Sequence, residues 1–298
     1  MKQPFENKSW MAYVKVVMAL LTILLIMGCE KPEMTQNPKG QPAETEANLT
    51  VSIYQLEQTP FAAISRAAVS SVCSRLNFAL YDMTGNRVKQ TNQQLGDADF
   101  GTASFQLAKG DYQLVIVAHS SKGNPTMTNA QKIQFSNDIG YTDTFLFNEV
   151  ITVGDTPLTI PATLQRIVSL CRFVITDDYP QEVALMRFVW KGGSGSFDAS
   201  TGFGSVNSTQ KLEVNASAAQ KQFDLYTFLH DTTGTIHLTV TAHDANDNVL
   251  NEHEFDVPMT QNQISWLSGS YFSDSNTQSL SLSLDVTTEW AGENYYSF

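Results

Sequence analysis

Apolar and polar residues alternate along most of this chain, and that pattern constrains the fold more than any other feature. Leu49, Val51 and Ile53 are each followed by Thr, Ser or Tyr, and residues 235–242 repeat the pattern. Successive side chains of a β-strand point to opposite faces of its sheet, so alternation is typical of a strand with one buried face. After residue 47 the sequence has no apolar helical stripe sustained over three turns. The chain is therefore predicted to be all-β.

Turn signals separate the predicted strands at short intervals. Residues 76–81 alternate and end at the turn sequence of 82–86, whereas residues 112–119 are apolar on both faces and predict a central strand. Residues 145–153 predict a further strand. In the second half, the predicted strands are 164–176, 183–190, 222–228, 235–242, 249–257, 264–272 and 280–286. Short strands separated by turns every ~8–12 residues indicate β-sandwiches.

The length of the chain and two prolines predict the domain division. The 298 residues are enough for two domains of ~100–200 residues each. Pro157 and Pro161 bracket a short segment that we expect to be the boundary. We therefore predict two β-sandwich domains in series, covering residues 48–158 and 159–298.

The charge balance excludes one class of partner. The net charge is −12, and only 16% of the residues are charged. Nucleic-acid phosphates are bound by clusters of Lys and Arg, which an acidic chain does not supply. Nucleic acid is therefore excluded as a partner.

The N-terminal residues predict export. Residues 16–27 form an apolar run that follows Lys15 and is shorter than the ~20 residues of a membrane-spanning helix. A basic flank and a short apolar run before small residues are typical of a secretory signal. We therefore predict a signal peptide over residues 1–28. Translation from Met11 gives a more compact signal, and we expect the true start there.

The end of this signal predicts a lipid anchor. The sequence Ile26-Met27-Gly28-Cys29 resembles the lipobox of bacterial lipoproteins, in which the chain is cut before the Cys and its thiol is acylated. We predict cleavage between Gly28 and Cys29 and attachment of acyl chains such as palmitate to Cys29. Residues 29–47 contain three Pro and no aromatic residue, which is typical of a flexible tether. Two or three acyl chains hold a protein firmly on a membrane.

Four segments of the chain resemble those of one known family. They are GDYQLVIVAHSSKG (110–123), LQRIVSLCRFVITDDYP (164–180), MRFVWKGGSGSFDASTGFGSVNS (186–208) and LTVTAHDANDNVL (238–250). These segments resemble the FimB-like fimbrial anchor lipoproteins of Bacteroidales, which are the anchor subunits of type V pili.

The resemblance implies a fold and a function. The fold would be two tandem transthyretin-like β-sandwich domains that follow the lipoprotein signal and the tether. The function would be to attach a surface pilus to the bacterial outer membrane, and to nucleate the pilus or limit its length, with a role in cell adhesion. Its partners would be the outer membrane, reached through the N-terminal acyl chains, and fimbrial pilin subunits. The family is not enzymatic, so we expect no catalytic residue, cofactor, metal or small-molecule substrate, and Cys29 is the one position carried over from it.

Two alternative functions remain open. Aromatic residues stack on sugar rings, and the second half ends in a group of them that would suit a surface glycan-binding lipoprotein: Trp266, Tyr271, Trp290, Tyr295 and Tyr296. The second alternative is a stalk pilin that is cut after Arg66, within a small polar loop over residues 64–68. That cut is disfavoured for an anchor, because it would discard Cys29 together with the predicted strand over 49–56.

Other groups of residues resemble chemical sites, but structural interpretations suit them better. Cys73 and Cys171 lie in apolar strands and are predicted to be buried free thiols, with a disulfide between the two predicted domains as the alternative. Residues 244–248 begin like a calcium loop, yet Val249 replaces the required Gly, so we expect a hairpin turn. His237, His243 and His253 share one predicted hairpin without further ligands, so we expect surface histidines instead of a zinc site. Residues 192–196 depart from the G-x-S-x-G motif and predict a flexible turn.

Overall fold

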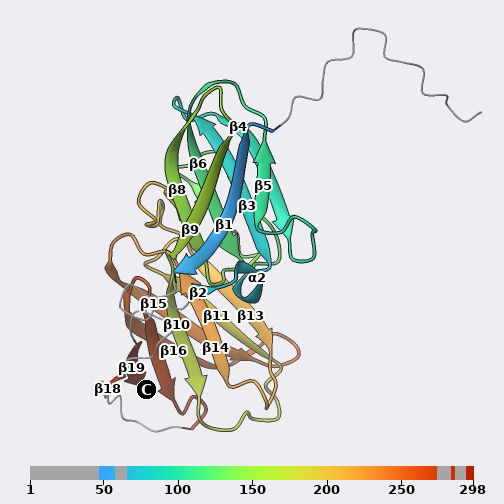
Figure 1. Cartoon of the computed structure of the whole chain (residues 1–298). Helices are drawn as coiled ribbons and strands as arrows, with labels where there is room; N and C mark the ends of the chain where they lie inside the picture. Colours follow the sequence, from blue (N-terminus) through green and yellow to red (C-terminus); the bar gives the residue numbers. More distant parts are fainter. Residues whose placement is uncertain (1–46, 58–65, 274–282, 286–292) are drawn as a thin grey trace, which may run out of the picture. The chain divides into compact units, whose positions relative to one another are not determined.

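The computed structural model describes residues 47–57, 66–273, 283–285 and 293–298. The regular structure of these residues consists of strands and of α2 (Val69–Val72), a helix of four residues (Figure 1). The prediction of an all-β chain is therefore confirmed. The predicted signal peptide and residues 29–46 of the predicted tether lie outside the described residues, so both stay predictions.

The first sheet contains eight strands. Seven of them have the order β2-β1-β9-β8-β6-β3-β4, and the eighth, β5, pairs with residues 49–52 of β1, whereas β2 pairs with residues 56–57. The strands are β1 (Leu49–Glu57), β2 (Arg66–Ala67), β3 (Arg75–Asp82), β4 (Arg87–Gln94), β5 (Thr102–Phe105), β6 (Gly110–His119), β8 (Phe145–Val153) and β9 (Leu158–Arg166). β1 and β9 are parallel, whereas the other pairs are antiparallel. β6 lies between β8 and β3, which confirms that residues 112–119 belong to a central strand.

Strand β3 is buried on both faces, although its sequence alternates. Leu76, Phe78 and Leu80 pack inside the first sheet, in a core that also contains Leu49 and Val51 of β1. The opposite face carries Ala79 and Tyr81, which are buried as well and pack in a different core. A strand with two buried faces needs cover from a second part of the molecule, and the C-terminal half contributes to that cover.

The side chain of Gln93 links β4 and β5, the two strands at which the first sheet would close. β4 and β5 do not pair through their backbones, but Gln93 of β4 is buried between them. Its Nε2 donates to the carbonyl oxygens of Asp99 and Thr102, at 3.0 and 2.6 Å. Its Oε1 accepts a hydrogen bond of 3.0 Å from the backbone N–H of Gly101. This amide replaces the missing ladder, so the sheet is nearly closed into a barrel.

The predicted linker lies at the start of a strand: Pro157 directly precedes β9, and Pro161 lies within it. Leu158 begins β9, which continues through Pro161 and pairs with β1 along its whole length. Pro161 lies opposite Ser52 in this pairing, and its side chain is exposed. A proline is tolerated at the edge of a sheet because its missing N–H can face solvent. The first sheet therefore extends to Arg166, past the predicted boundary.

The second half forms two further sheets, of five and four strands. The five-stranded sheet has the order β14-β10-β17-β19-β18, and the four-stranded sheet has the order β13-β11-β15-β16. The strands are β10 (Ser169–Ile175), β11 (Leu185–Lys191), β13 (Gln210–Asn215), β14 (Gln222–Thr227), β15 (Thr233–His243), β16 (Val249–Thr260), β17 (Ile264–Gly269), β18 (Ser283–Asp285) and β19 (Glu293–Ser297). Their inner faces share a core that includes Phe173, Phe188 and Trp190.

A third core joins residues of both halves. It combines Tyr81 of β3 with Leu170 of β10 and Phe228, which follows β14. Two short strands, β7 (Ile133–Gln134) and β12 (Ser196–Phe197), pair antiparallel beside it. Residues 46–298 accordingly form one compact unit.

A buried ion pair lies at the same junction. The guanidinium of Arg166, whose side chain is 2% exposed, donates to both oxygens of the Asp143 carboxylate at 2.7 Å. It also donates to Oδ1 of Asn262 at 3.2 Å, in the turn between β16 and β17. Its charge lies 5.0 Å from the centre of the Phe145 ring. Arg166 therefore ties the end of the first sheet to a turn of the second half.

Candidate assembly groove

The predicted lipid site lies outside the described residues. Gly28 and Cys29 belong to the undescribed segment 1–46, so cleavage and acylation stay predictions. The described residues contain no helix with the length and apolar character needed to cross a membrane.

Arg66 lies in a strand, whereas the sequence predicted a loop. Arg66 and Ala67 form β2, and their backbones pair with Glu57 and Leu56 of β1. A protease binds its substrate as an extended chain, so the Arg66–Ala67 bond would first have to leave this ladder. The bond that the stalk-pilin alternative requires to be cut therefore lies within a paired strand.

The two described cysteines are free and buried, as predicted. Cys171 lies in β10, but Cys73 follows α2 instead of lying in a strand. Burial raises the pKa of both thiols, that of Cys171 to about 12. A thiol held protonated is a poor nucleophile. These two residues therefore act as small apolar side chains.

The suspected calcium loop is a hairpin turn, as predicted. Oδ1 of Asp244 accepts hydrogen bonds from the backbone N–H groups of Asn246 and Asn248, at 2.8 and 2.9 Å. Asp247 has a positive φ of 65°, which suits the tight turn between β15 and β16. The carboxylate of Asp244 is thus committed to the backbone of its own turn.

The prediction of surface histidines is wrong for His243. Its side chain is 3% exposed, and its Nε2 lies 2.8 Å from Oγ1 of Thr241 and 3.2 Å from the guanidinium of Arg187. The last residues of β15 are buried on both faces, and the side chain of Arg187, from the neighbouring strand β11, lies against His243. His237 is exposed and contacts Asp256. Within the described part of the chain, no three His, Cys, Asp or Glu side chains are arranged to hold a metal.

Residues 192–196 are packed, and the prediction of a flexible turn is wrong. Ser194 is fully buried, and its hydroxyl donates to the carbonyl oxygen of Ser196 at 2.6 Å. A Cβ atom on Gly193 would lie 2.0 Å from Oγ1 of Thr227, so only glycine fits there. Gly192 likewise lets the backbone of Thr235 approach, because a Cβ there would lie 2.3 Å from its carbonyl oxygen.

The aromatic residues near the end of the chain are largely used within the fold. Tyr271 is buried, and Trp266 stacks on Tyr295 at 5.4 Å with an interplanar angle of 12°. The guanidinium of Arg172 lies 4.9 Å from the centre of the Trp266 ring. Trp290 lies outside the described residues. This arrangement favours cover of the core over an open platform for sugars.

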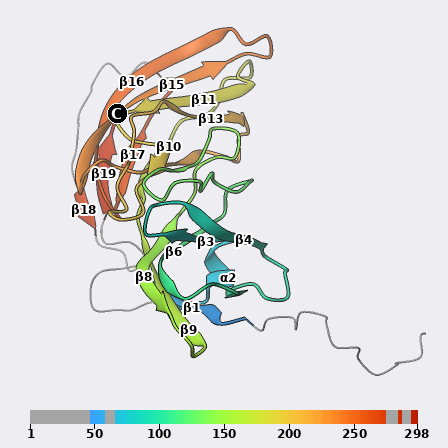
Figure 2. The same cartoon turned by 90° about the horizontal axis from the view of Figure 1, so that it is seen from above.

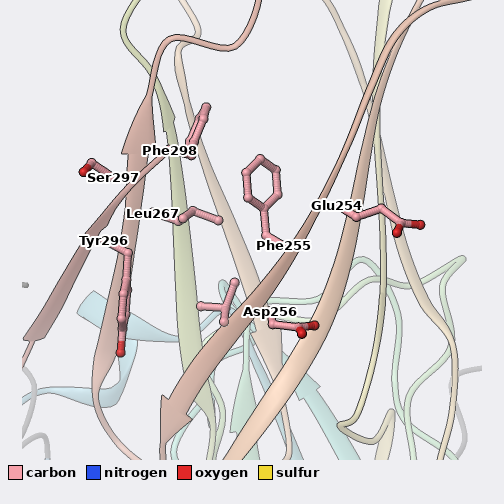
Figure 3. Close-up of a pocket in the computed structure, with 8 residues that line it drawn as sticks. Glu254, Phe255, Asp256, Leu267, Tyr296, Ser297 and Phe298 are labelled. Atoms are coloured by element: carbon pink, nitrogen blue, oxygen red, sulfur yellow. The ribbon is translucent and has the colours of Figure 1, made fainter. Parts of the chain in front are cut away.

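One edge of the four-stranded sheet has no paired strand among the described residues. The five-stranded sheet is one strand wider than the four-stranded sheet, whose last strand is β16. In the described residues, β16 pairs with β15 alone, so its other edge has no neighbouring strand. A groove of about 430 Å³ lies beside that edge (Figure 3). It is lined by Glu254, Phe255, Asp256, Val257, Leu267, Tyr296, Ser297 and Phe298.

The floor of the groove is apolar. The ring of Phe298 stacks on Phe173 at 5.0 Å and contacts Phe255 at 4.9 Å. Figure 3 shows Phe255 and Phe298 projecting into the space between β16 and β19. Phe298 is held there because its N–H donates to the carbonyl oxygen of Ser268 at 3.1 Å, and a Cβ on Gly269 would lie 2.1 Å from the carbonyl oxygen of Phe298.

The rim of the groove is acidic. Glu254 and Asp256 are exposed on β16 and point away from the core (Figure 3). Oδ1 of Asp256 lies 2.5 Å from Nδ1 of His237 on β15. Our sequence analysis did not identify this groove. The alternation of Glu252, Glu254 and Asp256 with His253 and Phe255 was the available signal, and it was assigned only to a strand.

Comparisons with known proteins identify the family of this chain. Residues 41–291 match the model of the family described as fimbrillin-A associated anchor proteins Mfa1 and Mfa2. A search of curated proteins gave no match.

Solved structures give distant similarities. A candidate adhesin from Bacteroides ovatus shares 13% identity over 74% of this chain and 88% of its own, with a TM-score of 0.46. A fimbrial assembly protein from Parabacteroides distasonis shares 13% identity over 74% of this chain and 90% of its own, with a TM-score of 0.39. The fimbrial anchor protein Mfa2 from Porphyromonas gingivalis shares 14% identity over 69% of this chain and 80% of its own, with a TM-score of 0.38.

Proposed function

Because this chain belongs to the family of fimbrillin-A associated anchor proteins, a structural and non-enzymatic family, we propose that it attaches a pilus to the bacterial outer membrane through acyl chains on Cys29. The family match over residues 41–291 is the observation that carries this proposal. The partners would be the outer membrane and the pilin subunits of the fimbrium. Nucleation of the pilus and control of its length belong to the same proposal.

The start of the fold supports a direct connection to the anchor. Asn48 precedes β1, and its side chain donates to the carbonyl oxygen of Leu107 at 2.9 Å and accepts from the N–H of Leu107 at 3.0 Å. The proposed tether, residues 29–47, thus ends where the chain is fixed to the first sheet. Pulling on a pilus would load the tether and then β1, which is held between β9 and β5.

The position of β1 supports an intact Arg66–Ala67 bond. Leu49, Val51 and Leu56 are fully buried in the core of the first sheet. A cut after Arg66 would separate both the lipid and these side chains from the rest of the fold. We therefore propose that the membrane-bound protein keeps this bond, in contrast to a stalk pilin. Mass spectrometry of the protein recovered with pili tests this, and an N-terminus at Ala67 would assign the chain to the stalk.

Two tandem transthyretin-like domains are also part of the proposal. The separate cores inside the first sheet and between the two later sheets support two sandwich units. Since β9 belongs to the first sheet, we propose that the division falls after Arg166 instead of after residue 158.

The decisive experiment compares a deletion strain, a Cys29→Ala strain and the parent strain. We expect attached pili in the parent, shed pili in the deletion strain, and release of the Cys29→Ala protein together with pili. Membrane retention of the Cys29→Ala protein would contradict the lipid anchor. Pili that stay attached after deletion would contradict the anchor function.

A further inference from the structure

The groove beside β16 lies where a fifth strand of the four-stranded sheet would be. The five-stranded sheet continues past β17 to β19 and β18, whereas the sheet that faces it stops at β16. The inner face of β19 therefore carries Tyr296, and beyond it Phe298, next to an edge with which no strand of the described residues pairs. One more strand on β16 would cover this apolar floor and give the two sheets equal width.

We propose that this groove binds one extended segment of a fimbrial subunit, which adds to β16 as a fifth strand and alternates apolar with basic residues. This inference rests on the proposed function and specifies its contact surface. Addition of a strand to an open sheet edge supplies affinity through backbone hydrogen bonds, and side-chain pockets supply specificity.

Pro258 indicates which backbone groups of β16 are available. It pairs with Thr235 of β15, and a proline has no N–H to give to that ladder. Its carbonyl oxygen accepts a hydrogen bond of 2.7 Å from the hydroxyl of Ser265 on β17, on the side away from β15. In an antiparallel strand, alternate residues turn both backbone groups to the same side. Glu252, Glu254 and Asp256 therefore present their N–H and C=O groups to the open edge, and Pro258 ends the row.

The charges of the groove select the side chains of the partner strand. Glu254 and Asp256 are exposed at the rim, and no basic residue lines the groove. The chain as a whole carries a net charge of −12. A partner strand with Lys or Arg on its rim side would gain attraction and faster association, whereas an acidic strand would be repelled. Its alternate apolar residues would contact Phe255, Tyr296 and Phe298.

The first test uses the full-length protein in detergent and synthetic peptides. Residues 252–256 extend over ~17 Å, so a peptide of about seven alternating Val and Lys residues covers the open row. We expect it to bind at least about tenfold more tightly than a Val–Glu peptide or a backbone N-methylated Val–Lys peptide. Hydrogen exchange should slow at the amides of Glu252, Glu254 and Asp256. Equal binding of the three peptides, or protection confined to other strands, would overturn the proposal.

Charge-reversal variants localise the site. Glu254→Lys should weaken binding of the Val–Lys peptide by about tenfold. Glu182→Lys makes the same charge change at an exposed residue that does not line the groove, and it should leave binding unchanged. Equal effects of the two variants would mean that net charge, not the groove, attracts the peptide, and would overturn the proposal.

The same variants in the bacterium separate this proposal from the anchor function. We expect Glu254→Lys cells to shed pili while the variant protein stays in the membrane, and Glu182→Lys cells to keep them. Glu254→Lys cells that keep their pili would overturn the groove as the attachment site, while shedding from the deletion strain would still support the anchor function. Pili retained even after deletion would refute the anchor function and, with it, the assignment of the partner as a fimbrial subunit.

Discussion

The two halves of this molecule differ in whether the edges of their sheets are covered. In the first sheet, β1 lies between β9 and β5, and the amide of Gln93 links β4 to the segment that leads into β5. In the second half, β16 pairs on one side only among the strands that the structure describes, and its open edge lies beside an apolar groove (Figure 2 shows β16 at the margin of its sheet). An unpaired edge is a template for another strand, and proteins normally protect it. This difference fits the two proposals above: β1, which follows the proposed tether, is covered on both sides, whereas the proposed partner contact lies on an open edge of the other half.

Removal of β1 should have the largest effect on this comparison. Leu49, Val51 and Leu56 are each 0% exposed. Burial of such a side chain is worth ~1.5–3 kcal/mol, so their loss costs ~5–9 kcal/mol, which is comparable with the stability of a whole domain. A chain that begins at Ala67 should therefore lose cooperative thermal unfolding of the first sheet. A truncated chain with an unchanged unfolding temperature would contradict a closed first half.

Acid should destabilise the closed half through His119. Burial, with the charge of Arg75, lowers the pKa of His119 from 6.5 to about 3. Its Nδ1 accepts from the N–H of Ser121 at 3.1 Å, so its Nε2 donates to Oδ1 of Asn77 at 2.8 Å, as in a neutral imidazole. Between pH 6.5 and 3 the unfolded chain binds the extra proton, so stability is full above pH 6.5 and falls toward pH 3, by up to about 1.4 kcal/mol per pH unit.

One variant checks the source of this pH dependence. His119→Gln keeps a donor toward Asn77 but removes the titrating group, so the fall in stability should become shallower. The measurement is urea unfolding at several pH values. Equal slopes for His119→Gln and the parent protein would show that another group is responsible.

The junction between the halves depends on Arg166. Arg166→Met would leave the Asp143 carboxylate without its bidentate partner, and breaking a buried pair in this way costs ~3 kcal/mol or more. Arg172 makes a similar pair with Asp224, but its side chain is 21% exposed, so Arg172→Met should cost only ~1 kcal/mol. Chemical denaturation measures both values. If the two losses were the same, the junction would not depend on the buried pair.

Loss of the Gln93 amide should open the first sheet slightly. Gln93→Leu removes three hydrogen bonds and leaves backbone groups of Gly101 and Thr102 unpaired, at a cost of ~2 kcal/mol. Hydrogen exchange of Gly101 should become faster. Gln94→Leu changes the exposed neighbour and serves as the control, with little effect on either quantity. Unchanged exchange at Gly101 in Gln93→Leu would show that the sheet closes without this amide.

The sequence predicted strands well where local alternation decides them, and failed where distant contacts decide. Residues 145–153 were predicted as a strand with its observed bounds, because their own pattern carries the information. The sequence could not show that Pro161 lies at the edge of a strand paired with β1, since that pairing joins residues more than a hundred positions apart. The packing of Ser194 beneath Gly204 and Phe228 was equally invisible from local composition.

The candidate groove was hidden from sequence reasoning for a related reason. The alternation in residues 252–257 predicts a strand, but an open edge is a property of the whole sheet. It appears only once β16 is known to be the last of its strands and β19 to extend past it. Acidic residues on an outer face are also ordinary for a soluble sheet, so Glu254 gave no separate signal.

The smallest expected effect on stability is that of Glu254→Lys, and it sharpens the comparison most. Glu254 is exposed, and substitutions at such sites usually change stability by no more than ~0.5 kcal/mol. The unfolding temperature of Glu254→Lys should therefore match that of Glu182→Lys and of the parent protein, although its binding of the Val–Lys peptide falls. In the closed half, by contrast, the residues that matter for the edges, Gln93 above all, are structural and cannot be changed without loss of stability. If the unfolding temperature of Glu254→Lys were instead several degrees lower, Glu254 would be needed for stability. The proposed difference between a half with covered edges and a half with an edge free for binding would then be wrong.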